Sequence, residues 1–125
     1  MKLRIQGNSL RLRLTRSEVA RLHENGGIEE TAHFGVGRSL TYSIRKRVGD
    51  SGVRAELVDA KITVHVPAGA VAAWATSDEV GINARDGVMR IAIEKDFRRL
   101  TRSREEDDPD AWPHPAGPAR IENGG

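Results

Sequence analysis

Hydrophobic and polar residues alternate along many short stretches of this chain. In residues 9–14 the alternation places Leu10, Leu12 and Leu14 on one face and Arg11 and Arg13 on the other, which is the period of a half-buried strand. The same period predicts further strands at 2–6, 28–34, 40–45, 53–57, 61–66, 80–82 and 89–93. Tight turns are expected at Gly7-Asn8 and Asp59-Ala60, and a D-G hairpin turn is expected over Ala84-Arg85-Asp86-Gly87.

Two short helices are expected between these strands. Thr15 and Glu18 have the T-x-x-E spacing of a capping box, and Gly26 follows the last helical residues, where a left-handed glycine ends many helices. Pro67 starts the second helix, because proline suits a first helical position. Helices of about ten residues are marginal alone, so we expect both to pack on the apolar face of the strands.

The second half of the chain repeats the pattern of the first. A shift of 52 positions aligns Leu10 with Ile62, Leu22 with Trp74, and Ile28 with Val80. We therefore predict an α+β fold built from a duplicated ββαββ unit, with halves at 1–48 and 53–96 that share one core. Residues 1–100 form the predicted domain, and its sheet is mainly antiparallel.

The alternation also predicts one polar face. It carries Lys2, Arg4, Gln6, Arg11, Arg13, Glu29, Thr31, His33, Thr41, Ser43, Arg45, Arg54, Glu56, Lys61, Thr63, His65, Arg90 and Glu94. Two arrangements remain open: a solvated sheet face with cross-strand charge pairs, or an eight-stranded barrel with this face lining the inside. In the barrel the cations would converge on a multi-anion, so the candidate anion-binding residues are Arg4, Arg11, Arg13, Arg45, Arg54, Lys61 and Arg90.

Charge is divided unevenly along the chain. The net charge is only +2, but residues 1–104 carry nearly all of the Lys and Arg, and an acidic run occupies 105–110. Residues 101–125 are rich in Pro and Gly, which predicts an extended or disordered tail, with Trp112 or Phe97 anchoring part of it. One hypothesis is that the acidic run folds back on the cations and competes with other anions.

Several kinds of chemistry have no residues to support them. The chain has no cysteine, and its four histidines lack ligand spacing, so we expect no metal, no cofactor and no catalytic residue. His33 and His65 are expected to be solvent-exposed. No apolar run is long enough to cross a membrane and none resembles a signal segment, so we expect no membrane partner and a cytoplasmic protein.

These patterns predict a non-catalytic interaction or anion-binding module, whose partner is a polyanion or a protein. One alternative is a hydrolase that acts on phosphoanhydrides or polyphosphate in a basic tunnel. The other is nucleic-acid binding. The residues of the predicted polar face favour it less, because none of them is an aromatic residue on which bases could stack. Phe34, Tyr42 and Trp74 fall instead at apolar-face positions, where core packing is expected.

Two resemblances add to this reading. The opening MKLRIQGNSLRLRLTRSEVARL, the segment IEKDFRRL, the acidic run and WPHP are similar to a small bacterial family of unknown function, DUF7009. That family's pattern has a cysteine at the position of Arg99, so no thiol role is carried over. The barrel alternative resembles the triphosphate-tunnel fold, but the E-x-E-x-K signature of that fold is replaced by Lys2-Leu3-Arg4-Ile5-Gln6.

Overall fold

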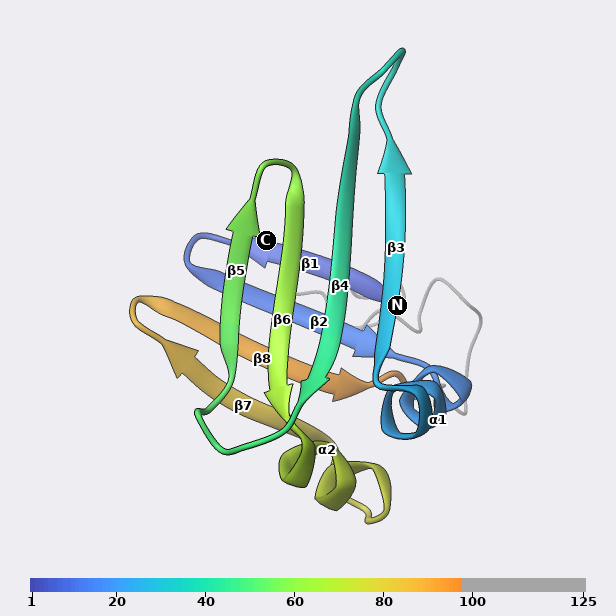
Figure 1. Cartoon of the computed structure of the whole chain (residues 1–125), viewed down its shortest axis with the longest axis vertical. Coiled ribbons are helices and arrows are strands. Elements are labelled where there is room, and N and C mark those ends of the chain that lie inside the picture. The colour runs from blue at the N-terminus through green and yellow to red at the C-terminus, as the bar shows by residue number, and fades with distance from the viewer. Residues whose placement is uncertain (98–125) are drawn as a thin grey trace, which may run out of the picture.

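The computed structural model describes residues 1–97 as eight strands and two helices (Figure 1). The elements are β1 (Lys2–Gln6), β2 (Ser9–Leu14), α1 (Arg16–Asn25), β3 (Gly27–His33), β4 (Ser39–Arg47), β5 (Arg54–Val58), β6 (Lys61–Pro67), α2 (Ala68–Ala75), β7 (Gly81–Asp86) and β8 (Met89–Lys95). The predicted α+β class is confirmed. The predictions for Trp112 and the acidic run lie outside the described residues.

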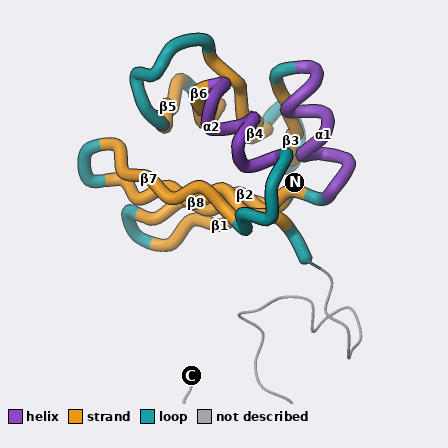
Figure 2. Tube along the Cα trace, turned by 90° about the horizontal axis from the view of Figure 1, so that it is seen from below, coloured by secondary structure: helices purple, strands orange, loops and turns teal. Residues whose placement is uncertain are grey.

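The strands form two separate mixed sheets of four strands each. The first sheet has the order β1-β2-β8-β7 and the second sheet has the order β3-β4-β6-β5. In both sheets the outer pairs are antiparallel hairpins, whereas the central pairs, β2 with β8 and β4 with β6, are parallel. Figures 1 and 2 show the sheets as two layers whose strands cross at a steep angle.

The eight-stranded barrel is therefore wrong. Within residues 1–97 the two sheets are not joined by strand pairing, and the chain crosses between them through α1 and α2. The apolar faces turn toward each other and form one core between the layers, so the polar faces point outward instead of lining a lumen. This arrangement places the arginines on outer faces and not in a closed lumen, which avoids the large cost of burying many unpaired charges together.

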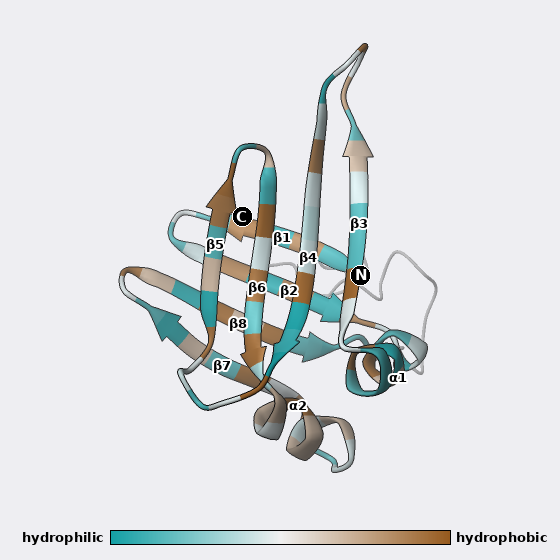
Figure 3. Cartoon of the chain, in the orientation of Figure 1, coloured by the Kyte–Doolittle hydropathy of each residue, from teal (hydrophilic) through white to brown (hydrophobic). Residues whose placement is uncertain are grey.

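The core is built from the alternating apolar residues of the four central strands (Figure 3). Leu12 lies beside Ile93 in the first sheet and Ile44 lies beside Val64 in the second, and none of the four is exposed. The helices lie together at one end of the two layers (Figure 2), where they add Val19, Leu22, Val71 and Trp74 to the core. The docking of short helices on apolar surface is thus as expected.

The predicted helix ends are also found. Thr15 is the N-cap of α1, its hydroxyl accepts from the Glu18 N–H, and the Glu18 carboxylate accepts from the Thr15 N–H at 2.9 Å, which completes the capping box. Gly26 ends α1 with a left-handed φ of 92°. Pro67, expected at the first helical position, lies one residue earlier: it ends β6 and precedes α2, which begins at Ala68, and it provides no side-chain cap.

Two details of the strand prediction are wrong. Val80 lies outside β7 and is exposed, and Ile82 occupies the inward position instead: it pairs with Ile93 as Ile28 pairs with Ile44. A constant shift of 52 therefore fails after the helices, because the connection into β7 is longer than the one into β3. Phe34, expected in the core, is 60% exposed beyond the end of β3.

The carboxylate of Asp86 ties the β7 edge of the first sheet to the second sheet. Asp86, the last residue of β7, accepts a hydrogen bond from the backbone N–H of Ala55 in the edge strand β5 at 3.0 Å. Exposed edge N–H groups invite pairing with another chain, and covering them is a common protection. Asp86 therefore caps part of the β5 edge while it joins the two layers.

None of the described helices is long and apolar enough to span a membrane.

Candidate functional site

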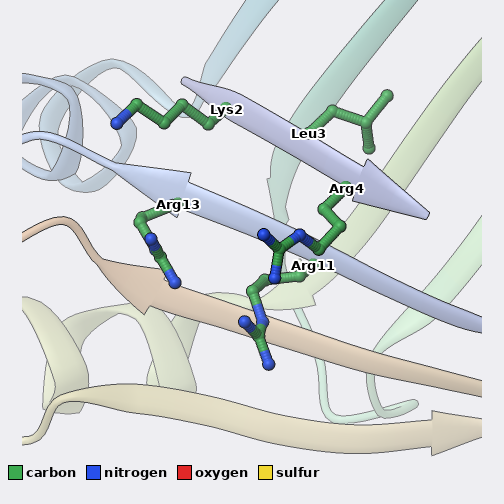
Figure 4. Close-up of a pocket in the computed structure, with 5 residues that line it drawn as sticks. All are labelled: Lys2, Leu3, Arg4, Arg11 and Arg13. Carbon is green, nitrogen blue, oxygen red and sulfur yellow. The ribbon is translucent and has the colours of Figure 1, made fainter. Parts of the chain in front are cut away.

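Six Lys and Arg residues occupy the outer face of the first sheet. The inward residues Leu10, Leu12 and Leu14 are buried, so their neighbours in β2 point outward, and the same alternation holds in the paired strands. The outer-face cations are Lys2 and Arg4 from β1, Arg11 and Arg13 from β2, Arg85 from β7, and Arg90 from β8. Figure 4 shows four of these side chains together on one side of the strands, with Leu3 pointing away.

The register places these cations opposite one another in pairs. Lys2 is paired with Arg13 and Arg4 with Arg11 across β1 and β2. At the other side of the sheet, Arg85 is paired with Arg90 across β7 and β8. Each of these three cross-strand pairs is therefore like-charged, an arrangement that destabilises a sheet.

Two carboxylates offset part of this charge. Glu94 of β8 lies 3.6 Å from both Arg11 and Arg13, and Asp96 lies 3.4 Å from Lys2. The side chain of Arg13 is only 13% exposed, and its guanidinium lies 3.6 Å from the Glu94 carboxylate. Among the described residues the six cations outnumber these two carboxylates, so this part of the chain gives the face an excess of positive side chains.

The same face is hollowed in several places, one of them a depression of about 280 Å³ lined by Gln6, Asn8, Ser9, Arg85, Val88 and Arg90. Another, of about 330 Å³, is lined by Lys2, Leu3, Arg4, Arg11 and Arg13. A third, of about 490 Å³, lies between Arg11, Arg85 and Arg90 over the small residues Ser9, Asn83 and Ala92. Arg11 lines the second and third of these depressions, so they are neighbours on the sheet.

The seven predicted anion-binding residues are divided between opposite sides of the molecule. Arg4, Arg11, Arg13 and Arg90 lie on the outer face of the first sheet, whereas Arg45, Arg54 and Lys61 lie on the outer face of the second. On the second sheet Lys61 contacts Glu29 at 3.0 Å, and Arg45 lies 3.8 Å from the same carboxylate. The structure does not bring the seven residues together.

Sequence reasoning left Lys2 and Arg85 out of the candidate set. Lys2 belonged to the predicted polar face but was not selected. Arg85 was assigned to a turn, whereas it lies in β7 opposite Arg90, and the turn begins after Asp86. The alternation of Ile82 and Ala84 with Asn83 and Arg85 was the signal that could have found it.

His65 was expected to be exposed to solvent, and this is wrong. It is 4% exposed, its Nδ1 accepts from Arg47 Nε at 2.8 Å, and its Nε2 lies 2.9 Å from Glu56 Oε1. The hydrogen bond from His65 holds the pKa of Glu56 below its ordinary value. Because both ring nitrogens are engaged, His65 is poorly placed to accept a proton from a substrate.

Ser43 and Thr63 lie on the same outer face, as expected, but both are buried there. The Ser43 hydroxyl donates a hydrogen bond to the Thr63 hydroxyl at 3.2 Å. No group of three or more His, Cys, Asp or Glu residues in the described part of the chain is arranged to hold a metal ion. Several polar side chains on the outer face of the second sheet thus hydrogen-bond or ion-pair with one another.

Comparison with known proteins gives a family and no activity. No curated protein and no solved structure matches the chain significantly. The pattern of a family of unknown function, DUF7009, matches residues 1–116. That match covers both sheets, both helices and the strands that carry the six cations, and the chain accordingly belongs to the DUF7009 family.

Proposed function

We propose that the protein is a non-catalytic module that binds polyanions on the outer face of its first sheet. The observation that carries the proposal is the set of three like-charged cross-strand pairs, Lys2–Arg13, Arg4–Arg11 and Arg85–Arg90. Like charges directly opposite each other are destabilising in a sheet, and each of these three pairs joins two of them. A cost of this kind without a gain in packing is expected where the charges serve a ligand.

The second sheet provides an internal comparison. It has the same strand arrangement, yet none of its outward antiparallel pairs joins two Lys or Arg residues: they are Gly27–Arg45, Glu29–Ser43, Thr31–Thr41, His33–Ser39, Arg54–His65, Glu56–Thr63 and Val58–Lys61. Glu29 and Glu56 flank this face, and two of its cations contact Glu29. The fold itself therefore does not require a face of opposed cations, which supports a role for the first sheet's face in binding.

We also infer that the chain is one domain made of a duplicated ββαββ unit, with halves at 1–48 and 53–96. Exchanging the halves converts the order β1-β2-β8-β7 into β5-β6-β4-β3, which is the order of the second sheet. Leu22 and Trp74 hold equivalent places, and neither is exposed. Each sheet takes one hairpin from each half, so the halves share a core, which supports a single folding unit.

A hydrolase that acts on phosphoanhydrides is the rival function. Its metal would need several carboxylate oxygens beside the cations, and Glu94 and Asp96 are the carboxylates that contact them among the described residues. Release of phosphate from tripolyphosphate in the presence of Mg²⁺ would favour the hydrolase, whereas binding without turnover favours the module.

The test replaces one opposed pair by neutral residues. In the Arg4→Gln/Arg11→Gln variant we expect affinity for a sulfated polysaccharide and for long-chain polyphosphate to fall about tenfold or more, since two charge-assisted contacts are lost. Its free energy of unfolding should change by less than about 1 kcal/mol, because the removal of a like-charged pair is offset by the loss of the Arg11–Glu94 contact. Binding is measured by titration calorimetry and stability by urea unfolding.

The matched control is Arg45→Gln/Arg54→Gln on the second sheet, which removes the same number of charges from the chain. An equal loss of binding in this control would show that only net charge matters and would contradict the proposal. Unchanged binding in Arg4→Gln/Arg11→Gln would contradict it as well.

The acidic run at 105–110 supplies a further prediction. If it competes for the cations, the chain ended at Arg104 should bind the same polyanions several-fold more tightly at low salt, with less difference at high salt, where such attraction is screened. A full-length chain with the acids of this run changed to their amides is the control for length. Equal affinities in all three chains would exclude competition.

A further inference from the structure

We propose that the ligand is an extended phosphate chain that lies diagonally across the first sheet, from the start of β1 to the end of β7. The inference rests on the proposed function, since it names the ligand of the same face. It follows from where the cations lie in the sheet and where they are missing.

The cations form a stripe that shifts from one side of the sheet to the other. Three rows of outward residues run across its four strands. Lys2 and Arg13 occupy β1 and β2 in the first row, and Arg4 and Arg11 occupy the same strands in the second. In the third row the cations move to β8 and β7 as Arg90 and Arg85. The stripe thus crosses the whole sheet.

The two corners away from the stripe lack cations. The β1–β2 corner of the third row carries Gln6 and Ser9, and the β8–β7 corner of the first row carries Glu94 and Gly81. Glu94 repels an anion from that corner while it lies 3.6 Å from Arg11 and Arg13 on the stripe. An anionic chain is therefore directed along the diagonal.

The length of the stripe distinguishes an extended ligand from a compact one. Three strand spacings and a shift of four residues along the strands give a diagonal of roughly 20 Å between Lys2 and Arg85. A triphosphate is shorter than this distance and can contact one end only. Arg11 joins the depression at one end to the depression over Ala92, so hollows follow the stripe, and a further depression between Gln6, Ser9, Arg85 and Arg90 adjoins its far end.

The outward residues of the first sheet are of types that bind phosphate and not of types that recognise bases. The arginine fork matches phosphate oxygens in pairs. Stacking of bases requires aromatic side chains, and the outward positions of β1, β2, β7 and β8 have none. The face is a sheet without an outward helix that could enter a major groove. The shared chemistry of inorganic polyphosphate and a nucleic-acid backbone is therefore what this face recognises.

The experiment compares tripolyphosphate, a medium and a long polyphosphate on the full chain. Affinity per phosphate should rise with length until the chain spans the stripe, and then level off. The Arg85→Gln/Arg90→Gln variant should lose about tenfold in affinity for the long chain and keep its affinity for tripolyphosphate within about twofold, since the other end is intact. Arg45→Gln/Arg54→Gln again serves as the control.

Single-stranded homopolymers of each base identify the source of the phosphates. Similar affinities for all four, each weakened by Arg85→Gln/Arg90→Gln, support the inference, as does binding of polyphosphate alone. A strong preference for one base, or nucleic-acid binding without polyphosphate binding, overturns it. Tripolyphosphate bound as tightly per phosphate as the long chain overturns the diagonal but leaves the proposed function standing. Failure of every polyanion to bind overturns both.

Discussion

Replacing Trp74 by alanine is expected to lower the free energy of unfolding by about 3–5 kcal/mol, because a large, fully buried side chain leaves a cavity. Trp74 fills the end of the core where α2 meets the two sheets, and its indole N–H donates to the Val80 carbonyl at 3.1 Å. Domains of this size are usually stable by about 5–15 kcal/mol. The loss would therefore remove a large part of the stability, and urea unfolding followed by circular dichroism measures it.

Two further variants separate the causes. Trp74→Phe keeps most of the apolar volume and loses the N–H donor, so it should cost clearly less than Trp74→Ala. Leu22→Ala, in the corresponding position of α1, should cost about 2–5 kcal/mol. If Trp74→Ala cost less than Trp74→Phe, or if both were neutral, the core described for this end of the molecule would be wrong.

The second large effect is expected at the α-amino group of Met1. Its ammonium donates to Glu18 at 2.5 Å and to Glu30 at 2.7 Å, and Tyr42 also hydrogen-bonds to Glu30. The Glu18 side chain in addition accepts from the Thr15 N–H at the start of α1. Glu18→Ala removes the contacts of this carboxylate with the Met1 ammonium and with the Thr15 N–H, and it should lower the free energy of unfolding by about 2–3 kcal/mol.

The same network predicts how stability depends on pH. Burial alone would lower the pKa of the Met1 ammonium, but its hydrogen bonds to Glu18 and Glu30 outweigh burial and raise the pKa above 8.0. Burial alone would raise the pKa of Glu18, but the Met1 ammonium and the Thr15 N–H outweigh it and lower the pKa below 4.5. The Met1 contribution is thus complete below pH 8.0 and lost as pH rises through the raised pKa, whereas the Glu18 contribution is complete above pH 4.5 and lost as pH falls through the lowered pKa.

Urea unfolding at pH values across both windows tests these signs. Glu18→Gln keeps an acceptor for the Thr15 N–H and removes the charge, so its stability should depend less on pH in both windows than that of the parent chain. Equal pH profiles for the parent chain and Glu18→Gln would show that the ion pair does not contribute.

Local features of this protein could be predicted because they depend on neighbours in the sequence. The capping box of Thr15 and Glu18 and the glycine end at Gly26 need only residues within one helix. Strands β1 and β2 follow from the strict alternation of apolar and polar residues. The turn at Gly7-Asn8 needs only a residue that tolerates a positive φ, and the φ of Gly7 is 56°. These elements were predicted at or near their true ends.

The candidate site was predicted only in part, because alternation gives the face of a strand and not the sheet to which it belongs. Arg11 and Lys61 follow the same pattern, yet they lie on opposite sides of the molecule. Likewise, His65 alternates with buried valines as an outward residue should, but the contacts with Arg47 and Glu56 bury it. Burial on the polar face depends on neighbours from other strands.

The sequence by itself determined the order of strands and helices, most of the apolar core residues, with Phe34 and Val80 as exceptions, and the fact that arginines alternate with leucines in β2. Only the tertiary structure decided that the hairpins of the two halves join in parallel central pairs, which gives two layers in place of a barrel. The reason is that strand pairing is a long-range choice: Arg85 and Arg90 come onto the same face as Arg4 and Arg11 only because β8 pairs with β2.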